Sequence, residues 1–267
     1  MTKSHVKGWL LQAPETRLLE TPTELDLFED PCNWVFKPAY SRFARQTLLQ
    51  PTRRQLAAIQ PTRAQPWVAQ RFITGKEHCS FSVLVDGKLK AHAVYHPRYR
   101  VGRGSGIWFD PVEAPAIQSF VEYFGVQTCY TGQVSFDYIR DIDGHDHVLE
   151  CNPRATSGVH LFDDQPTSLI AALNGTGPLI TPTMAPRQVG LAMLLFASPR
   201  HGLDRQFWRD WRRARDVILR PGDVKPLAAQ WLALAEITYR AVTQRSGLLA
   251  AATADIEWDG QPMGNTP

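Results

Sequence analysis

The sequence predicts an α+β fold in which antiparallel strands are flanked by helices, and two observations lead to this prediction. Two stretches of strand-forming residues each contain an Asp-Gly pair, Asp86-Gly87 and Asp143-Gly144. Both residue types tolerate the positive φ that a two-residue hairpin turn requires, so each stretch is expected to be a β-hairpin. Helical patterns lie between and after the hairpins, and this grouping of strands and helices is typical of α+β domains.

The composition fits a folded protein and excludes several classes of partner. The chain has 267 residues, of which 43% are hydrophobic, enough for one large domain or two small ones. Its net charge of +3, from 29 basic and 26 acidic residues, is too balanced to indicate nucleic-acid binding. Its apolar stretches are too short to span a bilayer, and residues 1–8 lack the apolar core of a signal peptide. The four cysteines show no CxxC spacing, so we expect reduced thiols in a cytoplasmic protein that binds neither nucleic acid nor membrane.

The elements before the first hairpin are expected to be short. A strand followed by a helix that Thr21 to Thr23 opens is predicted within residues 14–36. Asn33 to Pro38 is predicted to be a strand that the proline ends. A short helix is expected near Arg53 to Ile59.

The two hairpins and the later helices follow in order. The first hairpin is expected from Phe81 to Tyr95 and the second from Gly132 to Asn152, with a helix from Pro115 to Phe124 between them. Further helices are predicted from Pro166 to Leu173 and from Pro226 to about Arg245, because proline suits the first turn of a helix.

A tryptophan-rich segment, Arg205 to Arg215, is predicted to be a helix with an arginine face. Phe207, Trp208 and Trp211 supply its apolar stripe. A surface helix packed through its aromatic residues is the simplest interpretation. A contact with phosphate or membrane is the alternative, and nucleic-acid binding through these arginines would show strong salt dependence.

The second hairpin brings polar side chains together. If Asp143-Gly144 is a two-residue turn, Asp137 lies directly opposite Glu150, and Asn152 shares the face of Glu150 because side chains repeat every two residues. Val148 is expected on that same face. Carboxylates that face each other repel, so a cation is expected between them. Three oxygen ligands of this kind suit Mg²⁺, which takes its other ligands from water and phosphates.

The alternative to a metal site is a set of solvated polar residues on an exposed sheet face. The residues that follow favour the metal site, because Pro153 ends the strand and Arg154 is then placed to reach a phosphate bound to the metal. His145 and His147 flank the same turn, and exposed turn histidines explain them better than a second metal pair does.

The run Glu150-Cys151-Asn152-Pro153-Arg154, preceded by SFDYI and followed by Gly158, resembles the metal-binding signature of ATP-grasp ligases of the carboxylate–amine type. The resemblance covers about residues 13–162 and implies an ATP-grasp fold, whose antiparallel sheets and flanking helices enclose a nucleotide cleft. It also implies ATP and one or two Mg²⁺, or Mn²⁺, with Asp137, Glu150 and Asn152 as metal ligands. Arg154 would be catalytic, stabilising the transferred phosphoryl group.

Other segments in the order of that family support the resemblance. Lys37, at the end of a strand, resembles the phosphate-binding lysine and is a second catalytic candidate. The run QRFITGKE resembles the hinge of the family, which implies that Gln70 and Ile73 contact adenine, that Phe72 lines its slot and that Glu77 holds the ribose hydroxyls. The glycine-rich phosphate loop of the family is replaced by AYSRFAR, in which Ser41 and Arg42 are the candidate phosphate donors.

The loop after the first hairpin is the candidate substrate site. Three arginines, Arg98, Arg100 and Arg103, lie among glycines there, and arginine binds carboxylates bidentately. A basic surface loop is the alternative.

The resemblance implies a division into three parts and a two-step reaction. A small ATP-grasp subdomain is expected at residues 1–75, a larger one with the metal site at 76–185 and a helical extension at 186–267. The usual N-terminal domain of the family has no counterpart before residue 13, so a homodimer or a partner subunit stays open. A small-molecule carboxylate would attack the γ-phosphate of ATP to give an acylphosphate and ADP, and an amine or thiol would then displace phosphate. A non-catalytic nucleotide-binding module is the alternative.

Overall fold

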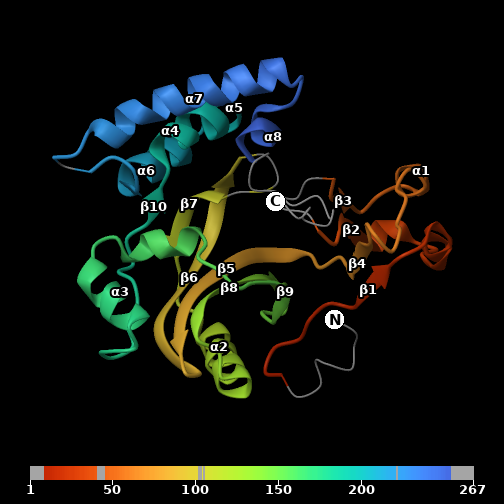
Figure 1. The fold of residues 1–267 in the computed structure, drawn as a ribbon, viewed down its shortest axis with the longest axis horizontal. Helices are drawn as coiled ribbons and strands as arrows, with labels where there is room; N and C mark the ends of the chain where they lie inside the picture. The colour runs from red at the N-terminus through yellow and green to blue at the C-terminus, as the bar shows by residue number, and fades with distance from the viewer. Residues whose placement is uncertain (1–8, 41–45, 102–103, 105, 221, 254–267) are drawn as a thin grey trace, which may run out of the picture. The chain divides into compact units, whose positions relative to one another are not determined.

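The computed structural model describes residues 9–40, 46–101, 104, 106–220 and 222–253 (Figure 1). They divide into two compact units. Residues 1–17 and 70–217 belong to the first unit, and residues 18–69 and 218–267 to the second. The boundaries between these units differ from the predicted boundaries at residues 75 and 185. The predicted boundaries concern ATP-grasp subdomains, and they stay predictions.

The first unit is built on a seven-stranded sheet with the order β11-β10-β7-β6-β5-β8-β9. Its neighbours pair antiparallel except for β10 and β11, which are parallel. Its strands are β5 (Gly75–Val85), β6 (Lys88–Arg100), β7 (Gly106–Pro111), β8 (Gly132–Asp141), β9 (Asp146–Asn152), β10 (Arg187–Gln188) and β11 (Arg215–Asp216).

Helical segments cover both faces of this sheet. Helix α2 (Pro115–Thr128) packs on one face, over a core that includes Phe136 and Tyr138. The 3-10 helix η4 (Ser157–Phe162) and helix α3 (Pro166–Leu173) pack on the other face, over a core that includes Phe81 and Tyr95. The remaining helices of the unit are α4 (Gly190–Ala192), the π-helix η5 (Met193–Ala197), α5 (Ser198–His201) and α6 (Arg205–Arg213).

The second unit has its own aromatic core around Phe28, Trp34 and Phe36. A four-stranded sheet with the order β1-β4-β2-β3 runs through it, and β4 continues into the first unit at Gln70. Its elements are β1 (Thr16–Leu19), η2 (Pro22–Leu27), η3 (Pro31–Asn33), β2 (Trp34–Pro38), β3 (Leu48–Leu49), α1 (Arg53–Leu56), β4 (Trp67–Arg71), α7 (Lys225–Thr243) and α8 (Leu248–Thr253).

The first predicted hairpin has the expected turn. Val85 pairs with Lys88, so Asp86 and Gly87 alone form the turn, and both have positive φ, 49° and 76°. Gly87 also lies so close to helix α2 that an added Cβ would approach the carbonyl oxygen of Gly125 to 2.8 Å.

The second hairpin differs from the prediction at its turn. Arg140 pairs with Asp146, and β8 ends at Asp141, so residues 142–145 connect the strands and not Asp143-Gly144 alone. The wider turn has a physical cause, because the carboxylate of Asp141 accepts hydrogen bonds from the backbone N–H groups of Asp143 and His145.

A β-bulge then corrects the register of the second hairpin. Tyr138 pairs with Val148, but Asp137 pairs with Glu150, so Leu149 is the extra residue on β9. Asp137 therefore lies opposite Glu150 as predicted. The prediction for Val148 was wrong, because the bulge places it with Tyr138 in the core under α2.

Residues 186–253 are less purely helical than predicted. Arg187 and Gln188 form β10 beside β7, and Arg215 and Asp216 form β11 beside β10, so this region extends the large sheet as well as supplying helices. The helix predicted near Thr21 to Thr23 is a short 3-10 helix, η2, in which Pro22 occupies the first turn.

Candidate functional site

The four polar residues singled out in the second hairpin lie together on one face of the sheet. Asp137 on β8 pairs with Glu150 on β9, and Asn152 lies two residues further along β9 on the same face. The side-chain Nδ2 of Asn152 donates to Oδ2 of Asp137 at 3.3 Å, and Nη2 of Arg154 donates to Oδ1 of Asn152 at 3.3 Å. The patch thus combines two carboxylates, an amide and a guanidinium.

The electrostatics of this patch indicate a place for a cation. The pKa of Asp137 is raised to about 6, above all by burial, and the carboxylates of Glu150 and Glu77 raise it further. The thiol of Cys79 and the guanidinium of Arg100 oppose this shift. A divalent cation would relieve the repulsion, and a purely oxygen donor set is what Mg²⁺ prefers, so the residues fit that ion.

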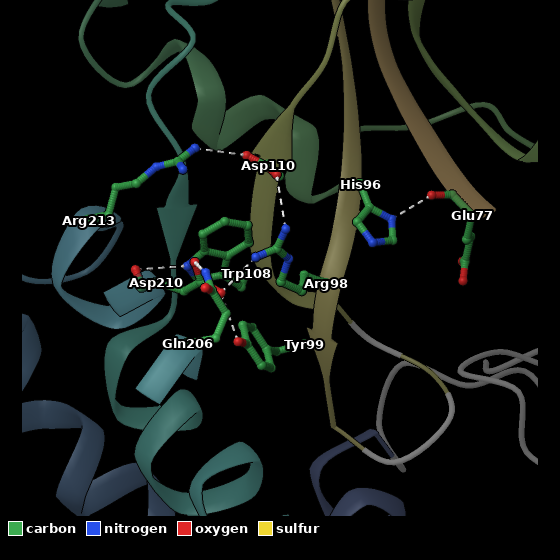
Figure 2. Close-up of polar contacts among 9 residues, drawn as sticks. All are labelled: Glu77, His96, Arg98, Tyr99, Trp108, Asp110, Gln206, Asp210 and Arg213. Atoms are coloured by element: carbon green, nitrogen blue, oxygen red, sulfur yellow. Dashed lines mark hydrogen bonds and ion pairs between the residues drawn. The ribbon is translucent and has the colours of Figure 1, made fainter. Parts of the chain in front are cut away.

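Glu77 lies close to this patch, at the start of β5. Its carboxylate forms an ion pair with Arg100. Figure 2 shows its backbone carbonyl, which accepts a hydrogen bond of 2.8 Å from Nδ1 of His96. Arg100, predicted to bind substrate, thus lies beside the carboxylates, and its Nη1 donates to the carbonyl of Gly104.

Gln70, predicted to contact adenine, is buried between strands. Its Nε2 donates to the carbonyl of Leu149, the bulged residue of β9, and to Oγ1 of Thr16, both at 3.3 Å. Because a carbonyl can only accept, the nitrogen must face Leu149. The amide oxygen of Gln70 is then the atom left for an adenine amino group.

The other predicted nucleotide-binding residues are distributed over both units. Phe72 and Ile73 are half-buried in the link between β4 and β5. Lys37 is half-buried on β2 in the second unit. Ser41 and Arg42 lie outside the described residues, as does Arg103 of the predicted substrate loop.

Arg98, the remaining predicted substrate residue, is part of a polar network with helix α6 (Figure 2). Its Nη1 donates to Oδ2 of Asp210 at 2.8 Å, and its guanidinium lies 5.2 Å from the centre of the Trp108 ring. The same Asp210 oxygen accepts from the Tyr99 hydroxyl at 2.8 Å, and its other oxygen accepts from Gln206 at 2.8 Å. Asp210 is buried, so Arg98 acts as its counter-charge.

Replacing Arg98 with Ala is expected to lower the free energy of unfolding by about 1–3 kcal/mol, because the buried Asp210 carboxylate loses its cation but keeps two neutral donors. Urea denaturation measures this change. Arg213→Ala is the matched control, since Arg213 is exposed and meets Asp110 only at 3.4 Å, and a near-zero effect is expected there. Equal stabilities of Arg98→Ala and the wild type would contradict the structural role.

The turn of the second hairpin carries the histidines considered above. Asp141, Asp143 and His145 have side-chain ligand atoms within 4.8 Å of one another. Asp141 also accepts from Nε2 of His147 at 2.7 Å, in addition to the two turn N–H groups. The turn geometry therefore accounts for this cluster.

Cys79 is the site residue that the sequence did not indicate. It is buried on β5 and pairs with Asp137 on β8, two strands that are far apart in the sequence. Each hairpin was predicted by itself. No local pattern indicates that the first strand of one hairpin, β5, pairs with the first strand of the other, β8.

Comparisons with known proteins identify structural likeness alone. No family model matches the sequence, and no curated protein matches it. Among solved structures, the chain is similar to the N5-carboxyaminoimidazole synthetase from Staphylococcus aureus, with a TM-score of 0.51, 12% identity and coverage of 76% of this chain. It is similar to the carboxyaminoimidazole ribonucleotide synthase from Aspergillus clavatus, solved with ATP, with a TM-score of 0.52, 11% identity and coverage of 69% of this chain. It is also similar to the N5-carboxyaminoimidazole ribonucleotide synthetase from Thermus thermophilus, with a TM-score of 0.51, 14% identity and coverage of 69% of this chain.

The chain spans only part of the length of these structures, 59%, 53% and 54% respectively. A search of the described helices finds none that is both long and apolar enough to cross a membrane.

Proposed function

Because the chain has an ATP-grasp fold, we propose that it is a ligase that uses Mg-ATP to activate a carboxylate as an acylphosphate for attack by an amine or a thiol. The observation that carries this proposal is the convergence of Asp137, Glu150, Asn152 and Arg154 on one face of the large sheet. Binding a nucleotide by itself would not need two carboxylates, an amide and a guanidinium arranged together.

The metal would be held by Asp137 and Glu150, with Asn152 as the third ligand. When bound, Mg²⁺ supplies positive charge that offsets the negative charge of the β- and γ-phosphates. Asp137 must be ionised to bind a metal, and its raised pKa of about 6 means that it gives up its proton near neutral pH.

The protein would bind and orient the other groups through its own side chains. Arg154 is exposed next to the metal ligands, where its guanidinium can stabilise charge on the transferred phosphoryl group. Lys37, Ser41 and Arg42 are the proposed phosphate contacts, and Gln70, Phe72 and Ile73 the proposed adenine contacts. Glu77 is the proposed ribose contact.

Arg100 and Arg103 are the proposed contacts of the substrate carboxylate. Arg98 is predicted from the sequence to bind substrate as well, but its pairing with Asp210 favours a supporting role, in which it holds the strand that leads into the loop.

Calorimetric titration with a non-hydrolysable ATP analogue, with and without Mg²⁺, tests the site. We expect Mg-dependent binding by the wild type and loss of the metal dependence in Glu150→Ala, together with loss of ADP release in a panel of carboxylates and amines. Glu122→Ala, on the exposed side of α2, is the control and should behave as the wild type. Retained ATP-dependent turnover in Glu150→Ala would refute the metal assignment, and tight ATP binding without ADP release for any acceptor would favour a non-catalytic module.

A further inference from the structure

A row of polar side chains lies beside Asp137 within an otherwise apolar core. Cys79 pairs with Asp137 across β5 and β8, and with Tyr95 across β5 and β6, so these three residues lie side by side on three adjacent strands. Cys79 and Tyr95 belong to the core cluster of Phe81, Phe109, Leu161 and Phe162, and Tyr95 is only 4% exposed.

Side-chain contacts continue along this row to the loop that carries Arg154. The Cys79 thiol lies beside the Asp137 carboxylate across β5 and β8, and the thiol opposes the rise in the pKa of Asp137. The Tyr95 hydroxyl lies within reach of Cys79 and Thr156, since both side chains act on its pKa, which burial above all raises. Oγ1 of Thr156 lies 2.9 Å from Oγ of Ser135, and this Ser135 hydroxyl lies 3.4 Å from the backbone carbonyl of Arg154.

The contacts of the metal face close the row into a ring. Arg154 donates to Asn152, and Asn152 donates to Asp137. We call this arrangement the polar ring. Its members are Asp137, Cys79, Tyr95, Thr156, Ser135, Arg154 and Asn152.

We propose that Cys79 and Tyr95 are positioning residues of the metal site, which fix the carboxylate of Asp137 relative to the Arg154 loop through the polar ring. This inference rests on the proposed metal-binding role of Asp137. Neither residue touches the nucleotide or the metal in this proposal.

The cost of burial supports a role beyond packing. A hydroxyl buried among apolar side chains is unfavourable unless it is hydrogen-bonded, and Phe at position 95 would fill nearly the same volume without that requirement. The backbone also approaches this point closely, because a Cβ on Gly158 would lie 2.9 Å from Cε1 of Tyr95. The loop after β9 therefore packs directly on the ring of Tyr95, where its hydroxyl can reach Thr156.

Mn²⁺ binding, followed by the electron paramagnetic resonance signal of the free ion, tests the proposal without any turnover. Tyr95→Phe is expected to weaken Mn²⁺ binding about tenfold, the lower range for residues that orient metal ligands. Tyr138→Phe is the matched control, because Tyr138 is also buried and lies 3.4 Å from the Ser80 hydroxyl, but it packs under α2 on the other face of the sheet. We expect wild-type Mn²⁺ affinity for Tyr138→Phe.

A second pair of variants tests the thiol by rescue. Cys79→Ala removes the thiol beside Asp137 and should weaken Mn²⁺ binding, whereas Cys79→Ser keeps a group that can donate to the carboxylate and should restore most of the affinity. Wild-type affinity in both Tyr95→Phe and Cys79→Ala would overturn the inference. If the wild type itself binds no Mn²⁺, or Glu150→Ala binds it equally well, the proposed function fails instead, so the two failures are distinguishable.

Discussion

Replacing Arg187 with Ala is expected to lower the free energy of unfolding by about 3–5 kcal/mol, the largest effect on stability that we predict for a single substitution. Arg187 is fully buried on β10, and its Nε donates to Oδ1 of Asp163 at 2.7 Å. Its Nη2 lies 3.0 Å from Oδ2 of Asp164, and its Nη1 donates to the carbonyl of Ala185 at 2.7 Å. Without the guanidinium, two neighbouring carboxylates would repel each other beside an empty space the size of a side chain.

Chemical denaturation monitored by tryptophan fluorescence measures this loss. Arg187→Lys should recover only part of it, because an ammonium group cannot donate to three acceptors in the planar geometry of a guanidinium. Arg240→Ala is the control, since its pair with Glu236 is exposed and should contribute less than about 0.5 kcal/mol. A loss below about 1 kcal/mol in Arg187→Ala would show that the ion pairs of β10 contribute no more than surface pairs do.

Local patterns in the sequence were sufficient for the fold class and for many elements. The α+β prediction is confirmed, and the predicted helix from Pro166 to Leu173 has the observed bounds of α3. The turn at Asp86-Gly87 also forms as predicted, because its conformation depends on the φ preferences of two adjacent residues.

The position of Asp137 opposite Glu150 was predicted from a turn that does not occur. The real turn shifts the register by one residue, and the bulge at Leu149 shifts it back. A single sequence does not reliably indicate a β-bulge, so the pairing of Asp137 with Glu150 was predicted correctly from a wrong turn. Val148 lies between the turn and the bulge, where the register is still shifted, and the sheet face predicted for it was therefore wrong.

Contacts between distant segments could not be predicted in this way. Arg98 and Asp210 are 112 residues apart, and nothing near Arg98 indicates that its partner lies on helix α6. An arginine in a glycine-rich loop therefore suggested a substrate contact. The same limit applies to Cys79, whose neighbour Asp137 belongs to the other hairpin.

Acidification is expected to destabilise the protein between pH 6.5 and pH 4 through two buried histidines. Burial lowers the pKa of His92 to about 4, and burial together with the charge of Arg140 lowers the pKa of His78 to about 4. Both side chains are nearly inaccessible, and each has a ring nitrogen without a hydrogen-bond partner among the described residues. The folded protein thus keeps these rings neutral, whereas the unfolded chain protonates them near pH 6.5.

Stability therefore falls as the pH falls, because the unfolded state binds more protons throughout this interval. The expected loss is about 2 kcal/mol for each histidine between about pH 7 and pH 5. Asp137 acts in the opposite sense, since its raised pKa of about 6 lets the folded state bind a proton first, and this offsets part of the loss.

Urea denaturation of the wild type and of His92→Asn at pH 7 and pH 5 separates these contributions. Asn keeps a polar atom near the Ser82 hydroxyl, which lies 2.9 Å from Nδ1 of His92, but it cannot be protonated in this range. The variant should lose about 2 kcal/mol less than the wild type on acidification, because only the wild type has a histidine here that is protonated in the unfolded chain and stays neutral in the folded protein. His78→Asn should give a similar difference, and the double variant should combine the two, so that the histidines no longer outweigh the stabilising effect of Asp137 protonation at pH 5. An identical loss in all four proteins would mean that neither ring is kept neutral by the fold, and that the acid sensitivity arises from the ion pairs of the carboxylates.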